Sequence, residues 1–248
     1  MKGEGKERLL ENRLIREIEH GKKIVHAAGD IWNWETTAGK LRWTRRAKML
    51  TSHISQEHRV LELGCGTGYF TKELAKTGAE IHAVDISPEL LQRAICKVNS
   101  RNVIFKIDNA YQMSCADAVF DAVVGSSVLH HLEIKKALSE CYRVLKPGGA
   151  IVFTEPNMLN PQIAVQKNIP FIKKRLGDSP DETAFFKWQM RKMLWKAGFK
   201  EICVESFDFL HPSVPKRFAK IVEKIGMAIE KIPFLKEFAG SLYIYARK

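Results

Sequence analysis

The sequence predicts an α/β protein in which helices pack against a parallel β-sheet. Three observations carry this prediction. The apolar run 59–63 leads into a glycine-rich turn and then an amphipathic stretch, which is typical of a buried strand, a tight turn and a helix start. Short apolar runs then alternate with helical patterns as far as residue 154, which implies parallel strands joined by right-handed crossovers. Finally, 248 residues suffice for one well-buried domain.

Two helices are predicted before the first strand. Residues 4–28 form a charged pattern with a rough apolar stripe, and residues 41–54 form a second helical pattern that is rich in arginine. The intervening segment 29–39 breaks the pattern and carries Trp32 and Trp34. We therefore assign residues 1–56 to an N-terminal helical cover and residues 57–248 to the α/β domain.

The elements of the α/β domain follow in order. Ser87 is a suitable cap for a helix with Pro88 at its first position. Pro147-Gly148-Gly149 should turn the chain into the fifth strand. Strands are predicted at 59–63, 80–84, 103–107, 121–124, 150–154, 201–206 and 241–246, and helices at 67–76, 88–98, 133–145 and 187–197.

Two segments depart from this alternation. Residues 156–182 contain four prolines and are predicted to be a non-repeating insertion on the substrate side. Residues 213–232 are predicted to contain a basic amphipathic helix, which either packs on its own domain or lies on an anionic membrane surface. The apolar stripe of this helix comprises Phe218, Ile221, Val222, Ile225, Ile229 and Ile232.

The turn after the first strand has glycines at alternate positions, Gly64, Gly66 and Gly68, with Glu62 just before them. Dinucleotide-binding turns have a different spacing, G-x-G-x-x-G. Glycine permits a close approach of the backbone to a ligand, and the N–H groups at the following helix start favour electron-rich partners. Asp85 ends the second strand, where a carboxylate can accept hydrogen bonds from both hydroxyls of a ribose.

Together these motifs resemble the class I S-adenosylmethionine (SAM)-dependent methyltransferases, in particular those that methylate small molecules, quinones or lipids. The resemblance covers about residues 40–205 and includes the stretches Phe120-Asp121-Ala122-Val123-Val124 and Leu145-Lys146-Pro147-Gly148-Gly149. It implies a doubly wound seven-stranded sheet, mostly parallel, in the order 3-2-1-4-5-7-6 with the last strand antiparallel. It also implies an enzyme that moves a methyl group from SAM to an acceptor by in-line displacement.

The resemblance also implies which residues bind the cofactor. Glu62 and the glycine turn would hold the methionine end, and Asp85 would bind the ribose. The adenine edge would be read by Asn109 or, if the loop is shifted, by Asp108. No metal is expected. The implied cofactor set is Glu62, Gly64, Cys65, Gly66, Asp85, Ile86, Asp108, Asn109, Ala110, Ser126 and His131.

The acceptor side is less defined by sequence. His131, near the transferred methyl group, is a candidate general base, because histidine exchanges protons near neutral pH; a structural role is the alternative. Core packing, a solvated face or loop hydrogen bonding are the alternatives for the other candidates. Those candidate acceptor contacts are Trp34, Arg42, Glu155, Asn157 and His211.

The composition indicates the cellular location of the protein and the kinds of partner it can bind. The formal net charge of +12 favours contact with polyanions, either an anionic membrane or nucleic acid, although it also serves solubility. Five scattered cysteines without a C-x-x-C pair argue against a disulfide framework or a zinc site. The absence of a long apolar run predicts a cytoplasmic protein, which is peripheral to the membrane if the basic helix meets one. An RNA methyltransferase and a non-catalytic SAM-binding protein remain the alternatives to a small-molecule enzyme.

Overall fold

The computed structural model describes residues 2–25 and 33–248, with side chains from Arg8 onward. Across these residues seven strands form one sheet in the order β3-β2-β1-β4-β5-β7-β6, as predicted. Only β7 runs antiparallel to its two neighbours. The strands are β1 (Arg59–Leu63), β2 (Glu80–Asp85), β3 (Val103–Ile107), β4 (Phe120–Ser126), β5 (Leu145–Pro156), β6 (Lys200–Phe207) and β7 (Ser241–Arg247).

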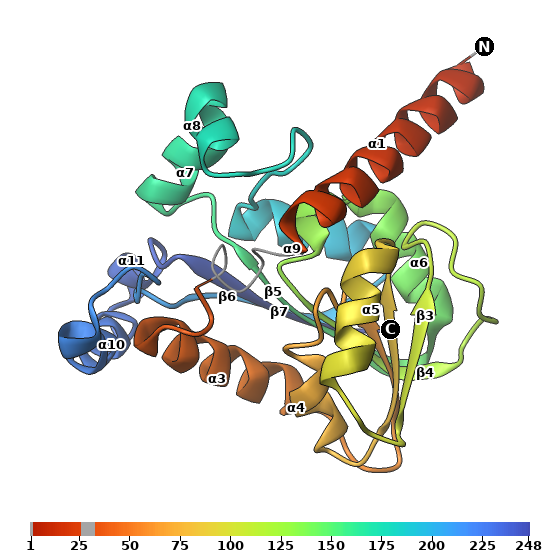
Figure 1. The fold of residues 1–248 in the computed structure, drawn as a ribbon, viewed down its shortest axis with the longest axis horizontal. Helices are drawn as coiled ribbons and strands as arrows, with labels where there is room; N and C mark the ends of the chain where they lie inside the picture. The colour runs from red at the N-terminus through yellow and green to blue at the C-terminus, as the bar shows by residue number, and fades with distance from the viewer. Residues whose placement is uncertain (1, 26–32) are drawn as a thin grey trace.

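Helices cover both faces of the sheet (Figure 1). One face is packed by α3 (Thr37–Thr51), α4 (Thr71–Ala75) and α5 (Pro88–Lys97), and the other by α6 (Ile134–Val144) and α9 (Lys187–Lys196). Successive residues of a strand point alternately into the two hydrophobic cores, one on each face of the sheet. Val60 packs with Leu50 and Leu91 on the first face, whereas Leu61 packs with Leu138 and Leu194 on the second. A strand that is buried on both faces reads as a continuous apolar run, which is why β1 was identifiable from sequence.

The N-terminal cover consists of α1 (Lys2–Ile24) and α3. The predicted break with Trp32 and the end of the first predicted helix lie outside the described residues. Helix α3 begins earlier than predicted because the hydroxyl of Thr36 accepts a hydrogen bond from the backbone N–H of Gly39 and caps the helix. Helix α1 packs tightly on the start of α5, since a Cβ atom added to Gly21 would lie 2.5 Å from the Ser87 hydroxyl.

The predicted non-repeating insertion contains two short helices, α7 (Pro161–Asn168) and α8 (Pro170–Arg175). Each begins with a proline at its first position, where the missing N–H costs nothing. Two of the four prolines that mark the predicted insertion, Pro161 and Pro170, are therefore helix starts. Strand β5 is also longer than predicted, because the Pro147-Gly148-Gly149 segment belongs to it and is accommodated by a register shift against β4.

The C-terminal part adds α10 (Lys216–Ile229) and α11 (Pro233–Lys236) between β6 and β7. Figure 1 places both helices at the edge of the molecule that also carries α7 and α8. Within the described parts of the chain, no helix is long and apolar enough to cross a membrane.

Candidate active site

A cavity of about 490 Å³ lies at the carboxyl ends of β1, β2 and β4. Ligands in open α/β sheets bind at this edge. The glycine turn forms the floor, and residues of α1, α3 and α7 form much of the wall. The size is in the range of small-molecule sites, which is about 300–1,000 Å³.

The glycine turn requires glycine for two physical reasons. Gly64 has φ +67°, which is the left-handed region that only glycine adopts at little cost. A Cβ atom at Gly64 would also lie only 2.4 Å from Cγ2 of Val128. Gly68, with φ +78°, similarly allows the turn to pack against Ala94 of α5. The turn therefore brings backbone close to the cavity.

Buried polar atoms without partners surround the turn. Among the described residues, Oε2 of Glu62 and the hydroxyls of Thr67 and Thr71 have no hydrogen-bond partner. Burial raises the pKa of Glu62 to about 8, and the nearby carboxyl of Asp85 adds to the rise, while the Thr71 hydroxyl opposes it. A carboxyl in this state is suited to receive a cation or a hydrogen-bond donor. This pattern fits the ammonium group of a bound amino acid.

Asp85 joins the turn to the next strand. Its Oδ2 accepts the backbone N–H of Gly66 at 2.8 Å, and its Oδ1 accepts that of Ser87 at 2.9 Å. Burial nevertheless raises the pKa of Asp85, because these two bonds do not replace the hydration of a free carboxylate. Each oxygen retains capacity for another donor. Asp85 lines the cavity and is thus placed to accept hydroxyl groups.

The loop after β3 differs from the favoured prediction. The side-chain carbonyl of Asn109 accepts the N–H of Tyr111 in a local turn, and Asn109 does not line the cavity. Asp108, the alternative residue, does line it. Its carboxylate also holds the N–H and hydroxyl of Ser114. The loop is therefore organised by Asp108 rather than by Asn109.

The other predicted cofactor residues lie at the cavity wall. The structure places there Gly64, Cys65, Gly66, Ile86, Ala110, Ser126 and His131, whereas Glu62, also predicted to bind the cofactor, is buried and does not line the cavity. The Cys65 thiol is buried, and burial raises its pKa well above the ordinary range. The negative charge of Asp85 raises this pKa further. A protonated thiol is a poor nucleophile, so Cys65 serves as a small residue in a crowded turn.

Glu155 and Asn157 do not face the cavity, contrary to the prediction of acceptor contacts. Both are fully buried. Glu155 accepts hydrogen bonds from the backbone N–H groups of Val128 and Leu129 at 2.9 and 2.8 Å and lies 2.7 Å from Nδ1 of His130. Asn157 donates to the carbonyls of Glu237 and Ala239. These two residues fix the backbone behind the cavity.

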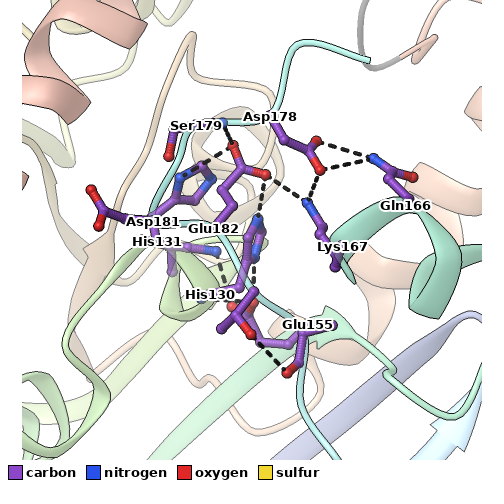
Figure 2. A network of polar contacts seen from close by, with 12 residues as sticks. His130, His131, Glu155, Gln166, Lys167, Asp178, Ser179, Asp181 and Glu182 are labelled. Atoms are coloured by element: carbon purple, nitrogen blue, oxygen red, sulfur yellow. Dashed lines mark hydrogen bonds and ion pairs between the residues drawn. The ribbon is translucent and has the colours of Figure 1, made fainter. Parts of the chain in front are cut away.

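A network of buried charges connects the cover to the cavity (Figure 2). His130 and His131 both lie beside Glu182, which also binds Lys167 at 2.6 Å. From α1, Glu17 reaches His131 with 2.9 Å between its Oε2 and Nδ1. The network thus ties α1 and the α7–α8 segment to the turn after β4.

The two histidines respond oppositely to this network. Burial alone would lower the pKa of His131, but the carboxylates of Glu17 and Glu182 outweigh it and raise the pKa. The pKa of His130 is lowered by burial and by the charge on His131, despite Glu155. Burial would raise the pKa of Glu182, but His131, His130 and Lys167 reverse this and bring it to about 2. Protonation is therefore favoured more at His131 than at His130.

We predict that Glu17→Gln lowers the pKa of His131, because it removes the contact that does most to raise it. The imidazole resonances of His131, followed by NMR as a function of pH, measure this directly. Because the folded pKa is raised, the pair stabilises the protein below the unfolded pKa of His131, and this stabilisation is lost as pH rises through the folded pKa. Glu19→Gln on the same helix is the control, and an unchanged His131 titration in Glu17→Gln would refute the role of this contact.

His130, His131 and Glu182 also have the donor types and proximity of a metal site, with their ligand atoms within 4.8 Å of one another. The ammonium of Lys167, however, already lies 2.6 Å from Oε2 of Glu182. It supplies the positive charge that a divalent cation would otherwise provide. We therefore interpret the cluster as an ion-pair network.

Two arginines of α3, Arg42 and Arg46, also line the cavity. Arg42 Nε donates to Oδ2 of Asp208 at 2.8 Å, and Arg46 Nη2 lies 3.3 Å from the same oxygen. Arg46 is only 4% exposed and its Nε has no hydrogen-bond partner in the described structure. Burial and the charge of Arg42 lower the pKa of Arg46 to about 10. Two cations thus share one carboxylate oxygen.

The other two predicted acceptor contacts also line the cavity. Trp34 packs edge-on against Phe70, and His211 lies 2.7 Å from the amide nitrogen of Gln162 on α7. Burial lowers the pKa of His211, and Arg42 lowers it further.

Sequence reasoning missed Arg46, Asp208, Glu17 and Glu182. The spacing of Arg42 and Arg46 by one helical turn was the only available signal, because the other partners come together through tertiary contacts.

The sheet order and the glycine turn define the class I methyltransferase architecture, and comparisons with known proteins agree. Residues 61–153 match the family described as "Methyltransferase domain". A demethylmenaquinone methyltransferase from Lactiplantibacillus plantarum is 27% identical over 224 residues, covering 81% of this chain and 94% of that protein. A second, from Mycobacterium marinum, is 37% identical over 131 residues, covering 51% of this chain and 53% of that protein.

A solved structure shows the same fold. The SAM-dependent methyltransferase from Thermotoga maritima superposes with a TM-score of 0.67 at 18% identity, covering 91% of this chain and 98% of that one. The chain is a class I SAM-dependent methyltransferase, and residues 61–153 carry its methyltransferase domain.

Proposed function

We propose that this protein transfers the methyl group of SAM to a small or lipid-like acceptor that carries an anionic oxygen. The observation that supports the proposal is the single cavity that runs from the glycine turn to Arg42 and Arg46 beneath α1 and α7. A cavity of this size is in the range that small-molecule ligands occupy.

At one end of the cavity, Glu62 and the turn would bind the amino-acid part of SAM, with Asp85 on the ribose. Ile86 would pack against the adenine and Asp108 or the backbone of Ala110 would meet its edge. When bound, SAM supplies an activated methyl group on a sulfonium. The hydroxyl of Thr67 supports this assignment, because it lines the cavity, has no hydrogen-bond partner among the described residues and would be satisfied by a ligand.

At the other end, Arg42 and Arg46 would bind an anionic group of the acceptor, with His211 and Gln162 beside it. The free Nε of Arg46 supports this, since an unsatisfied buried donor costs about 1–3 kcal/mol. Demethylmenaquinone, named for two relatives, is a lipid-like acceptor that gives a phenolic oxygen on reduction. We take this chemical class, an acidic oxygen on an apolar body, as the first to test.

Catalysis would come mainly from alignment, because holding two reactants in line contributes about 7–11 kcal/mol. Leu132 and the α1 residues of the wall would exclude water from the transfer site. His131 would take a proton where the acceptor must lose one. The contact with Glu17 raises its pKa, so this role would require pH above that raised pKa.

Transfer of a radioactive methyl group from SAM tests the proposal. The purified protein is offered in parallel a reduced quinone precursor, a phosphorylated amine, a total lipid extract and total RNA. Label in the quinol or lipid fraction is expected. Label in RNA alone would replace the proposal with an RNA methyltransferase, and SAM binding without any transfer would indicate a non-catalytic protein.

Arg42→Met should raise the KM for the acceptor about tenfold, the loss of one charge-assisted hydrogen bond, while the Kd of SAM stays unchanged. Arg45→Met is the matched control, because Arg45 lies in the same helix but pairs with Glu230 and does not line the cavity. Initial-rate kinetics and calorimetry provide the two measurements. Equal KM values for the two variants would remove Arg42 from the acceptor site.

A further inference from the structure

We propose that the α7–α8 and α10–α11 segments form a surface that docks onto an anionic lipid bilayer and places the acceptor end of the cavity at the membrane. Docking itself does not depend on the proposed function, because membrane binding is measured without cofactor or acceptor, whereas the placement of the acceptor end rests on that function. Figure 1 shows the two segments at the same edge of the molecule, away from α5 and α6.

Helix α10 exposes most of an apolar stripe that a packed helix would bury. Its buried residues are the small Ala219 and Gly226, which allow close packing on the domain. Phe218, Ile221 and Ile225 are 45%, 57% and 53% exposed. Helix α6 is comparably amphipathic, but its apolar residues from Ala137 to Val144 are fully buried. The apolar face of α10 is thus unexplained by folding alone.

The adjoining segments extend this apolar surface. After α10, Ile232 is 48% exposed and Phe234 at the start of α11 is 73% exposed. On α8, Phe171 is 71% exposed, and it stands between Ile169 and Leu176, which are also exposed. Single exposed apolar residues are normal, but a gathering of this kind marks an interaction site.

The charges beside these residues identify the partner as anionic. Helix α8 ends in Lys173-Lys174-Arg175 and contains no acidic residue. Glu223 is the only acidic residue within α10. The basic residues of α10 and the loop after it are Lys216, Arg217, Lys220, Lys224 and Lys231. By helical spacing they flank the exposed apolar residues, as in helices that lie in the interface of a bilayer. Each contributes attraction to anionic lipids.

The cavity connects to this surface. Gln162, Ile163 and Leu176 of the α7–α8 segment line it from one side, and residues 208–212, which lead into α10, line it from the other. The two sides are in contact, since Nε2 of Gln162 lies 2.7 Å from Nε2 of His211. Docking would therefore bring the arginine end of the cavity to the lipid surface, where an amphiphilic acceptor resides.

Vesicle flotation tests the proposal with the full chain. We expect the protein to float with vesicles of equal parts phosphatidylglycerol and phosphatidylcholine, and not with phosphatidylcholine alone. The triple variant Ile221→Ser, Ile225→Ser and Phe234→Ser should weaken this binding by about tenfold or more, because it removes buried apolar area. Its net charge is unchanged, so the loss would not come from weaker electrostatics.

A control triple variant replaces exposed apolar residues by serine elsewhere on the surface. Trp195→Ser, Ile104→Ser and Ile95→Ser replace residues that are 70%, 49% and 45% exposed outside the proposed surface, and binding should be unchanged. Equal binding by the two triple variants would show that charge alone holds the protein and would overturn the proposal. Failure of the wild-type protein to bind anionic vesicles at low ionic strength would overturn it as well. So would tight RNA binding without vesicle binding.

Discussion

Asp85→Ala is expected to weaken SAM binding at least about 100-fold, which corresponds to about 3 kcal/mol for the loss of charged hydrogen bonds to two hydroxyls. Asp85 is buried at the wall of the cavity, and each of its oxygens accepts only one backbone bond from the protein. Isothermal calorimetry with SAM measures the effect. Undiminished affinity would mean that the nucleoside does not lie against Asp85.

A second variant separates binding from folding. Asp85→Ala also leaves the N–H groups of Gly66 and Ser87 without their acceptor, so its melting temperature should fall. Asp85→Asn keeps one acceptor oxygen and the size of the side chain, and it removes a carboxyl whose pKa is raised by burial. We expect the Asn variant to lose less stability than Asp85→Ala, because one of the two N–H groups keeps its acceptor, and still to bind SAM more weakly.

Glu62→Gln is expected to remove a pH dependence of stability. The folded pKa of Glu62 is about 8, against 4.5 when unfolded, so the folded state retains a proton that the unfolded state loses. The wild-type free energy of unfolding should therefore fall as pH rises from 4.5 to 8 and level off above. At about 1.4 kcal/mol for each pH unit, the loss is on the order of 3–5 kcal/mol.

Urea unfolding of the cofactor-free protein at roughly pH 5, 7 and 9 measures this effect, because these pH values span the titration of Glu62. The difference between wild type and Glu62→Gln should grow in favour of the variant toward pH 9. Glu57→Gln, a substitution at a fully exposed carboxyl, is the control and should show no such trend. A flat difference would mean that Glu62 is ionised in the folded protein. The Gln variant should also bind SAM more weakly, because it cannot carry a charge opposite an ammonium group.

The sheet was predictable because its strands obey local rules. The runs at β1 and β3 were bounded correctly, and their order followed from the family resemblance carried by Gly64, Asp85 and the Leu145–Gly149 stretch. The insertion was predicted less well. Proline at the first position of α7 and of α8 is a helix start, but the sequence alone did not distinguish it from a helix break.

The residues of the candidate site were also predicted with uneven success. Residues whose position depends on one strand end, such as Asp85 and Ser126, were predicted to lie where the cavity is found. Asn109 and Glu155 were also predicted to face the cavity but do not line it, because a local turn and a set of backbone N–H groups satisfy their side chains first. The partners of His131 are Glu17 and Glu182, which lie more than a hundred residues apart in the sequence. No local pattern indicates such a contact.

Helix α1 has a kinetic consequence. It contributes Arg13, Glu17 and His20 to the wall beside His131, and Arg13 donates to the carbonyl of His131 at 2.6 Å. Any movement of α1 away from the cavity would break these contacts, so a ligand that enters or leaves on this side does so only when the helix opens.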